Sequence, residues 1–235
     1  MSQVQKPPFW SMAAAEPFRI FFPLGVLVGI SGVSLWPLYF LGIHHSFYPG
    51  VMHARMMIEG FMGAFILGFL GTAGPRLMGT SPFSRRELFT LLTLYVLTVG
   101  IHIAERYLVA DIFFLCLLLT FLGFLASRFR SRDDLPPPSF VLVGFGFLNA
   151  LVGTVLLILG GFGKVSSAAL LLGNILLYQG FVLYLLLGVG AFLLPKFLKL
   201  PQPSFPGARL PLRGISNFRT SLHGRGALNA AASPA

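Results

Sequence analysis

Residues 53–61, His-Ala-Arg-Met-Met-Ile-Glu-Gly-Phe, gather the side chains best suited to metal chemistry into one short segment of an apolar chain. His53, Met56 and Met57 follow i, i+3, i+4 spacing, which places them on one face of a helix. Histidine and methionine are ligands that suit copper and haem iron. These three residues are therefore candidate cofactor-binding residues, with core packing as the alternative role of the two methionines.

Two charged residues of the same segment are further candidates. Glu59 lies well inside an apolar run, where a polar side chain is costly and usually has a partner or a function. It can relay protons, pair with Arg55, or lie protonated against a neighbouring helix. Its position on the helix is about 120° from that of His53, so the two side chains need not share a ligand.

Three other histidines are candidate ligands. His102, Glu105 and Arg106 follow i, i+3, i+4 spacing, and a carboxylate near a ligating histidine commonly fixes its tautomer. An interfacial ion pair explains that triplet equally well. His44 and His45 are candidate metal ligands just before the metal-chemistry segment, and a simple loop role suits them equally.

The composition shows what must position these residues. The chain of 235 residues is 55% hydrophobic and 10% charged, with a mean hydropathy of +0.81, whereas soluble domains carry about 25% charged residues. We therefore predict an all-α, polytopic membrane helix bundle. Six apolar runs are long enough to span a bilayer. They cover residues 20–43, 57–74, 88–104, 108–126, 140–161 and 165–194.

Helix breakers and charge refine this prediction. Pro75 and Pro195 are predicted to end the second and sixth helices, and the long sixth run to tilt, protrude or break. Fourteen of the 17 Lys and Arg residues fall on one side of such a bundle, which predicts that both termini are cytoplasmic. Glu59, Glu105 and Asp111 then fall on the outer half. The predicted organisation is a cytoplasmic segment (1–19), a transmembrane domain (20–195) and a basic cytoplasmic tail (196–235).

Several classes of function are excluded by the same observations. The net charge of +10 comes from residues between apolar runs and in the tail, where they set topology and meet anionic lipid, so we expect no nucleic-acid partner. Cys116 is the sole cysteine, which excludes disulfides and cysteine-based zinc or iron–sulfur sites within the chain. The c-type haem motif is absent, so any haem would be non-covalent. Whether the protein is an enzyme stays open.

The chain resembles the NnrS family of bacterial membrane proteins over about residues 16–200. Residues 17–22 (Pro-Phe-Arg-Ile-Phe-Phe) are similar to that family's Arg-Pro-Phe-Phe start. Residues 53–61 are similar to its Trp-His-Ala-His-Glu-Met-x-x-Gly-Phe stretch, and residues 68–75 match Gly-Phe-Leu-x-Thr-Ala-x-Pro. Residues 190–197 weakly resemble a later Gly-Gly-Arg-x-x-Pro-x-Phe segment.

The resemblance implies a protein of the bacterial inner membrane that binds haem b, copper or both near the periplasmic face and is linked to nitric oxide or related redox metabolism. Two positions depart from the family pattern: its second histidine is Arg55 here, and its glutamate is Met56. A site that needs both histidines would lose a ligand, which His44, His45, His102 or Met57 would have to replace. The chain resembles only the first half of a longer family, which implies a homodimer or an accessory subunit.

Two alternatives to a redox protein follow from the residues. The first is a non-catalytic structural subunit of a respiratory or photosynthetic membrane complex, which would hold no cofactor and would contact its partners through glycine-rich helices and the basic tail. The second is a small transporter with a polar path along Glu59, Asn149, Asn174 and Gln179, for which the sequence shows no paired broken helices.

Overall fold

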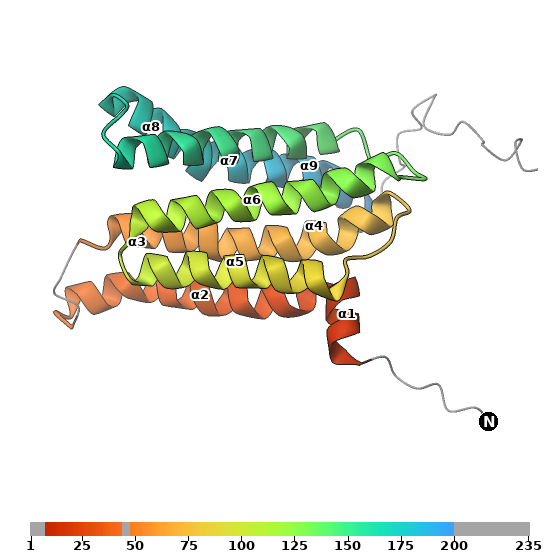
Figure 1. Ribbon diagram of the computed structural model, residues 1–235, viewed down its shortest axis with the longest axis horizontal. Coiled ribbons are helices and arrows are strands. Elements are labelled where there is room, and N and C mark those ends of the chain that lie inside the picture. Colours follow the sequence, from red (N-terminus) through yellow and green to blue (C-terminus); the bar gives the residue numbers. More distant parts are fainter. Residues whose placement is uncertain (1–7, 44–47, 200–235) are drawn as a thin grey trace, which may run out of the picture. The chain divides into compact units, whose positions relative to one another are not determined.

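Six long apolar helical spans run side by side in the computed structural model, which describes residues 8–43 and 48–199 (Figure 1). Each span is long and apolar enough to cross a membrane. The described part of the chain contains helices and no strands. The predicted all-α bundle of six transmembrane helices is thereby confirmed.

The spans are built from ten helical segments, two of which are π-helical. They are α2 (Phe18–Phe40), α3 (Gly50–Arg55) continuing through η1 (Met56–Met62) into α4 (Gly63–Leu77), α5 (Arg85–Ile103), α6 (Tyr107–Arg130), α7 (Phe140–Gly161), and α8 (Ser167–Ile175) continuing through η2 (Leu176–Gly180) into α9 (Phe181–Phe197). A short helix, α1 (Phe9–Ala15), precedes them and packs against α5 through Trp10, whose ring lies 4.9 Å from that of Phe89.

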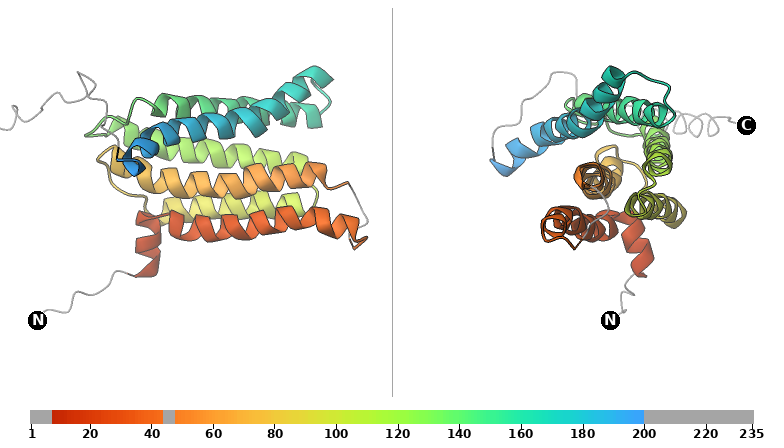
Figure 2. Two further views of the ribbon diagram at one scale, coloured as in Figure 1. Left: turned by 180° about the vertical axis from the view of Figure 1, so that it is seen from behind. Right: turned by 90° about the vertical axis from the view of Figure 1, so that its left-hand side faces the viewer.

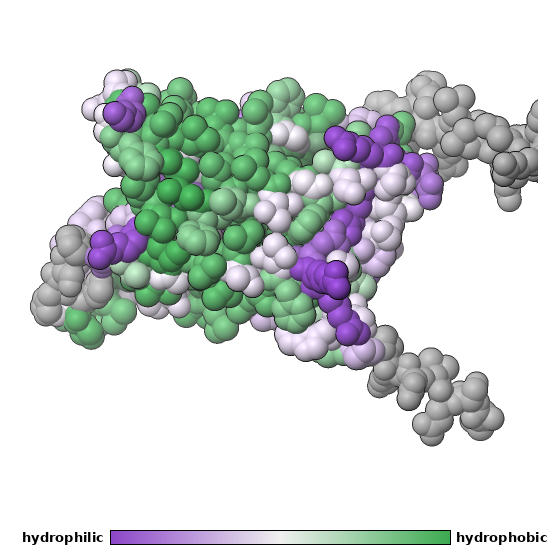
Figure 3. Space-filling view, in the orientation of Figure 1, coloured by the Kyte–Doolittle hydropathy of each residue, from purple (hydrophilic) through white to green (hydrophobic). Residues whose placement is uncertain are grey.

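The span from Gly50 to Leu77 is the central one. In its most apolar stretch 61% of the residues are buried, against 22–39% in the other five spans. It packs against α2, α5 and α6, as the end-on view in Figure 2 shows. Side chains on the outer faces of the other spans are largely apolar (Figure 3), as lipid contact requires. The protein is a multi-pass membrane protein whose candidate residues lie on its most enclosed helix.

The helix boundaries correct two predictions. The second span begins at Gly50 and not near residue 57, so His53 and Arg55 lie within it. Pro75 and Pro195 do not end their helices, because α4 continues to Leu77 and α9 to Phe197. Each proline removes one N–H donor from its helix, and each helix ends two residues later.

Charged residues gather at the end of the bundle near α1, which we call the amino-terminal end; the opposite end is the distal end. At the amino-terminal end Glu16 pairs with Arg76 and Arg19, and these guanidinium groups hold the pKa of its carboxyl below the usual value. Ser84 and Glu87 form a capping box at the start of α5, and Arg128 binds both carboxylate oxygens of Glu87. These contacts link the end of α2 to that of α4, and the end of α5 to that of α6.

The hairpin of α7 with α8, η2 and α9 depends on glycine. A Cβ atom placed on Gly153 would lie 2.8 Å from the backbone nitrogen of Leu177 and 2.9 Å from the carbonyl oxygen of Gly173. Backbone atoms cannot move aside as a flexible side chain can. We expect Gly153→Ala to lower the free energy of unfolding by at least about 2 kcal/mol, as overpacking does in a tight core. Thermal unfolding in detergent would measure this.

Gly144 on the same helix is the matched control, because no atom lies within 4 Å of a Cβ placed there. Gly144→Ala should be neutral or stabilising by up to about 1 kcal/mol, since alanine is the better helix former. Equal effects of the two substitutions would show that the close approach at Gly153 is not required.

Candidate metal centre

Four charged or ionisable side chains meet inside the distal half of the bundle, and we call this group the polar centre: Arg55, Glu59, His102 and Asp111. Arg55 Nη1 donates to Glu59 Oε1 at 2.6 Å, and Arg55 Nη2 donates to Asp111 Oδ2 at 2.9 Å. His102 Nε2 lies 2.9 Å from Glu59 Oε2. The polar centre therefore joins the second span to the third through His102 and to the fourth through Asp111.

The polar centre is removed from solvent. Glu59 and His102 are fully buried, Asp111 is 2% exposed and Arg55 is 5% exposed. Isolated charges at such sites would be very costly, so they persist only when paired and hydrogen-bonded. The Tyr178 ring also lies against the guanidinium, with its centroid 5.8 Å from Arg55 Cζ.

Two π-helical turns contribute to this arrangement. Glu59 lies in η1, and Tyr178 lies in η2 of the sixth span. A π-helical turn inserts an extra residue into a helix and is frequent at functional sites. Both turns in the described chain thus carry a side chain that faces Arg55, although they belong to spans more than 100 residues apart in sequence.

Three buried polar atoms of the polar centre have no hydrogen-bond partner: Arg55 Nε, His102 Nδ1 and Asp111 Oδ1. Since Glu59 accepts from His102 Nε2–H, the Nδ1 atom of the neutral ring carries a lone pair. The carboxylate oxygen Oδ1 is likewise an acceptor. Buried unsatisfied atoms in a native structure commonly indicate a bound ion or water.

These donors suit a metal ion. Glu59, His102 and Asp111 each offer a ligand atom, and the three atoms lie within 4.8 Å of one another. Imidazole suits copper, zinc and iron, and carboxylate oxygen can complete such a site. The glutamate that fixes the His102 ring matches the usual support of a ligating histidine. The residues therefore fit a metal ion, with His102 and Asp111 as its ligands.

His53 belongs to a different cluster. Its Nδ1 donates to the carbonyl oxygen of Gly32 at 2.9 Å, which leaves Nε2 as the nitrogen with a lone pair. The ring is half-buried and lies edge-on to Trp36. Met57 is next to it, because its sulfur would be 3.3 Å from a Cβ placed on Gly32. His53 and Met57 thus form a half-exposed pair against α2, which fits a haem ligand better than the enclosed His102 does.

The remaining predicted residues lie as follows. Met56 is 2% exposed and is part of the hydrophobic core. Glu105 follows the end of α5, and Glu59 contributes a carboxylate that contacts His102. His44 and His45, the predicted metal ligands, lie outside the described residues. The described structure therefore brings Arg55, Glu59 and His102 together and separates them from His53.

Sequence reasoning missed two members of this environment. The sequence predicts Asp111 on the outer half of the bundle and indicates no role for it or for Tyr178, whereas both face Arg55 in the structure. An acidic residue in the second turn of an otherwise apolar span was the available signal for Asp111. No sequence signal distinguishes Tyr178 from the other aromatic residues.

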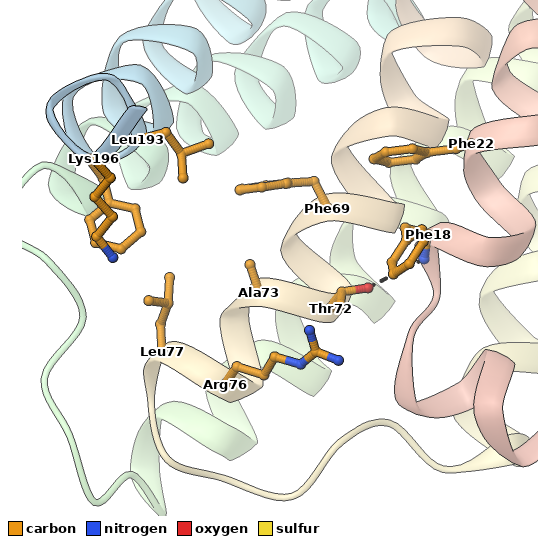
Figure 4. Close-up of a pocket in the computed structure, with 10 residues that line it drawn as sticks. Phe18, Phe22, Phe69, Thr72, Ala73, Arg76, Leu77, Leu193 and Lys196 are labelled. Carbon is orange, nitrogen blue, oxygen red and sulfur yellow. Dashed lines mark hydrogen bonds between the residues drawn. The ribbon is translucent and has the colours of Figure 1, made fainter. Parts of the chain in front are cut away.

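A cavity of about 450 Å³ lies at the amino-terminal end of the bundle, away from the polar centre, between α2, α4 and α9 (Figure 4). Its walls are mostly apolar, and Arg76 and Lys196 supply its charged groups. It has no histidine or carboxylate in its lining, so it offers no ligand set for a metal.

The comparisons with known proteins identify the family. No curated protein and no solved structure matches the chain. The family model described as NnrS protein matches residues 12–220, which is most of the chain and includes all six spans. The match covers residues 53–61 and every residue of the polar centre. This protein belongs to the NnrS family.

Proposed function

We propose that this chain is a redox protein of a bacterial inner membrane that binds copper, haem b or both in the distal half of its bundle and acts in nitric oxide or related redox metabolism. The observation that carries the proposal is the polar centre, with its two unpartnered buried acceptors on His102 and Asp111. Family membership supports it independently.

The charges of the polar centre favour one further cation. Two carboxylates and one guanidinium leave a net charge of −1 when His102 is neutral. Burial of a net charge in a bundle of low polarity is unfavourable. A proton or a monovalent metal ion such as Cu⁺ brings the total to zero. Copper therefore suits the imidazole ligand, and as Cu⁺ it would balance the charge of the site.

Each residue then has a distinct task. His102 and Asp111 would hold copper, while Glu59 orients the imidazole and Arg55 holds both carboxylates in place. His53 would hold haem b through Nε2, with Met57 beside it. When bound, such a group supplies a redox centre that can bind nitric oxide. The surrounding helices exclude water from the polar centre.

The proposed orientation follows from charge. Four basic residues lie at the amino-terminal end of the bundle: Arg76, Arg85, Arg128 and Lys196. Arg106 lies at the distal end. The positive-inside rule then places the amino-terminal end in the cytoplasm and the polar centre towards the periplasm. The proposed domain division remains a transmembrane domain with a basic cytoplasmic tail.

A structural subunit is the second candidate. Arg55 already pairs with both carboxylates, so the polar centre can serve as an ion-pair network that fixes helix packing without a metal. On this alternative the protein holds no cofactor and contacts a second copy or a larger membrane complex, partly through the basic tail.

Absorption spectra of the purified protein separate these candidates. We expect a Soret band that sharpens on reduction, at about one haem per chain, and that shifts when nitric oxide is added. A colourless, metal-free protein that co-purifies with other membrane subunits would contradict the redox proposal and support the structural one.

A further inference from the structure

We propose that a cavity beside the polar centre binds the head group of a membrane quinone or quinol. The cavity measures about 430 Å³ and lies between α3, α6, α7 and α8–η2. Arg55 and Asp111 form part of its lining. This inference concerns a second ligand and goes beyond the proposed cofactor function.

Each of four polar residues that line the cavity has at least one atom without a hydrogen-bond partner among the described residues. Arg55 Nε and Asp111 Oδ1 are buried without a partner, and the side chains of Asn174 and Tyr178 have no hydrogen bond among the described residues. The cavity thus presents hydrogen-bonding groups from Asn174 and Tyr178, beside a charged edge formed by Arg55 and Asp111. A ligand that both donates and accepts hydrogen bonds would satisfy them.

The rest of the lining is apolar and aromatic. Leu108, Leu157 and Leu170 contribute aliphatic walls, and Tyr48 and Tyr107 contribute rings. A flat ring would gain from stacking on such side chains. The ligand should therefore be a small aromatic or quinonoid ring with oxygen substituents and an apolar remainder.

A membrane quinone meets each requirement. Its carbonyl oxygens accept from Asn174 Nδ2 or the Tyr178 hydroxyl, and the hydroxyl of the reduced form can donate to Asn174 Oδ1. Its apolar tail keeps it in the bilayer, where the walls of this bundle lie. The cavity volume is of the size that binds small organic ligands, about 300–1,000 Å³.

The chain contains its own reporter for this site. Of its two tryptophans, Trp36 lies with its ring 5.4 Å from that of Tyr48, a residue of the cavity lining, whereas Trp10 lies at the amino-terminal end against Phe89. A quinone is a quencher of tryptophan fluorescence. Binding in the cavity should quench Trp36 and spare Trp10.

The experiment titrates ubiquinone-1 into the full-length protein in nanodiscs and records tryptophan fluorescence of the Trp10→Phe and Trp36→Phe variants. We expect saturable quenching in Trp10→Phe and only weak, linear quenching in Trp36→Phe. Tyr178→Phe and Asn174→Leu, introduced into Trp10→Phe, should each weaken the apparent Kd by at least about fivefold, because each removes one hydrogen-bond donor. Tyr184→Phe, outside the cavity on α9, should leave the Kd unchanged.

Linear quenching of both tryptophans would overturn the proposal, because the quinone would then merely partition into the bilayer. Saturable quenching that Tyr178→Phe and Asn174→Leu leave unchanged would overturn it as well, because the quinone would then not bind in this cavity. Metal content measured on the same samples separates the two proposals. If the protein binds ubiquinone-1 but contains no metal, only the proposed cofactor function is contradicted. If the protein contains copper but does not bind ubiquinone-1, only the proposed quinone site is contradicted.

Discussion

Replacing Arg55 by leucine is expected to lower the free energy of unfolding by about 3–5 kcal/mol, which is the usual cost of removing one partner from a buried ion pair. Arg55 is 5% exposed and its guanidinium binds both Glu59 and Asp111. Without it, two carboxylates would remain buried close together with only His102 beside them. The apparent midpoint of thermal unfolding in nanodiscs measures the loss.

A variant from which all three charges are removed is the control. Arg55→Leu combined with Glu59→Gln and Asp111→Asn removes all three charges and keeps side chains of similar size. We expect this variant to recover most of the lost stability, because neutral replacement of a buried ionic group is often tolerated. If Arg55→Leu alone unfolds at the wild-type temperature, the ion pairs do not hold the spans together as described.

The second large effect is expected from two histidine substitutions, each of which should remove one cofactor and leave the other bound. His102→Gln keeps an amide donor for Glu59 but removes the ring nitrogen, and it should lower bound copper at least about tenfold, as loss of metal-site residues does. His53→Gln keeps a donor for the carbonyl of Gly32 and should remove haem. Each variant should retain the other cofactor, because the two rings belong to separate hydrogen-bond networks.

Copper analysis and the reduced absorption spectrum, taken on the same preparation, read out both effects. If either substitution removed copper and haem together while the protein stayed folded, a single shared centre would replace the two proposed ones. Circular dichroism would verify the fold, since the described chain is predominantly helical.

Much of the fold followed from hydropathy. The period and length of the apolar runs located all six spans, and the fifth was placed at its observed bounds, Phe140–Gly161. The predicted start of the second span, residue 57, lies too far along the chain, because Arg55 and His53 lower the local hydropathy. Their polarity is compensated by tertiary partners, which a hydropathy argument along one helix does not include.

The polar centre was predictable only in part. Arg55 and Glu59 are four residues apart, so their pairing followed from helical geometry, even though η1 is π-helical. His102 reaches Glu59 from another span, 43 residues away, and Asp111 reaches Arg55 from a third span, 56 residues away. Such contacts depend on which helices are neighbours and how they are rotated, and no local pattern contains that information. The π-helical turns are hidden for the same reason, since the apolar runs continue through them.

The departure from the family pattern at residue 55 acquires a physical meaning in this arrangement. Where the family resemblance places a second histidine, this chain has a permanent cation that binds two carboxylates. Arginine stays charged at all relevant pH values and cannot ligate a metal. The proposed metal site therefore relies on His102 and Asp111, each of which has a buried atom without a hydrogen-bond partner.

The most direct test is copper quantification with X-ray absorption spectroscopy on the purified, copper-loaded protein. We predict one copper per chain with imidazole nitrogen and carboxylate oxygen ligands at about 2.0 Å, distances typical of such ligands on transition metals. Asp111→Asn should lower the copper content, and Met56→Leu should leave it unchanged because Met56 is a core residue. A protein that takes up no copper, or a ligand shell of sulfur alone, would contradict a metal centre at His102 and Asp111.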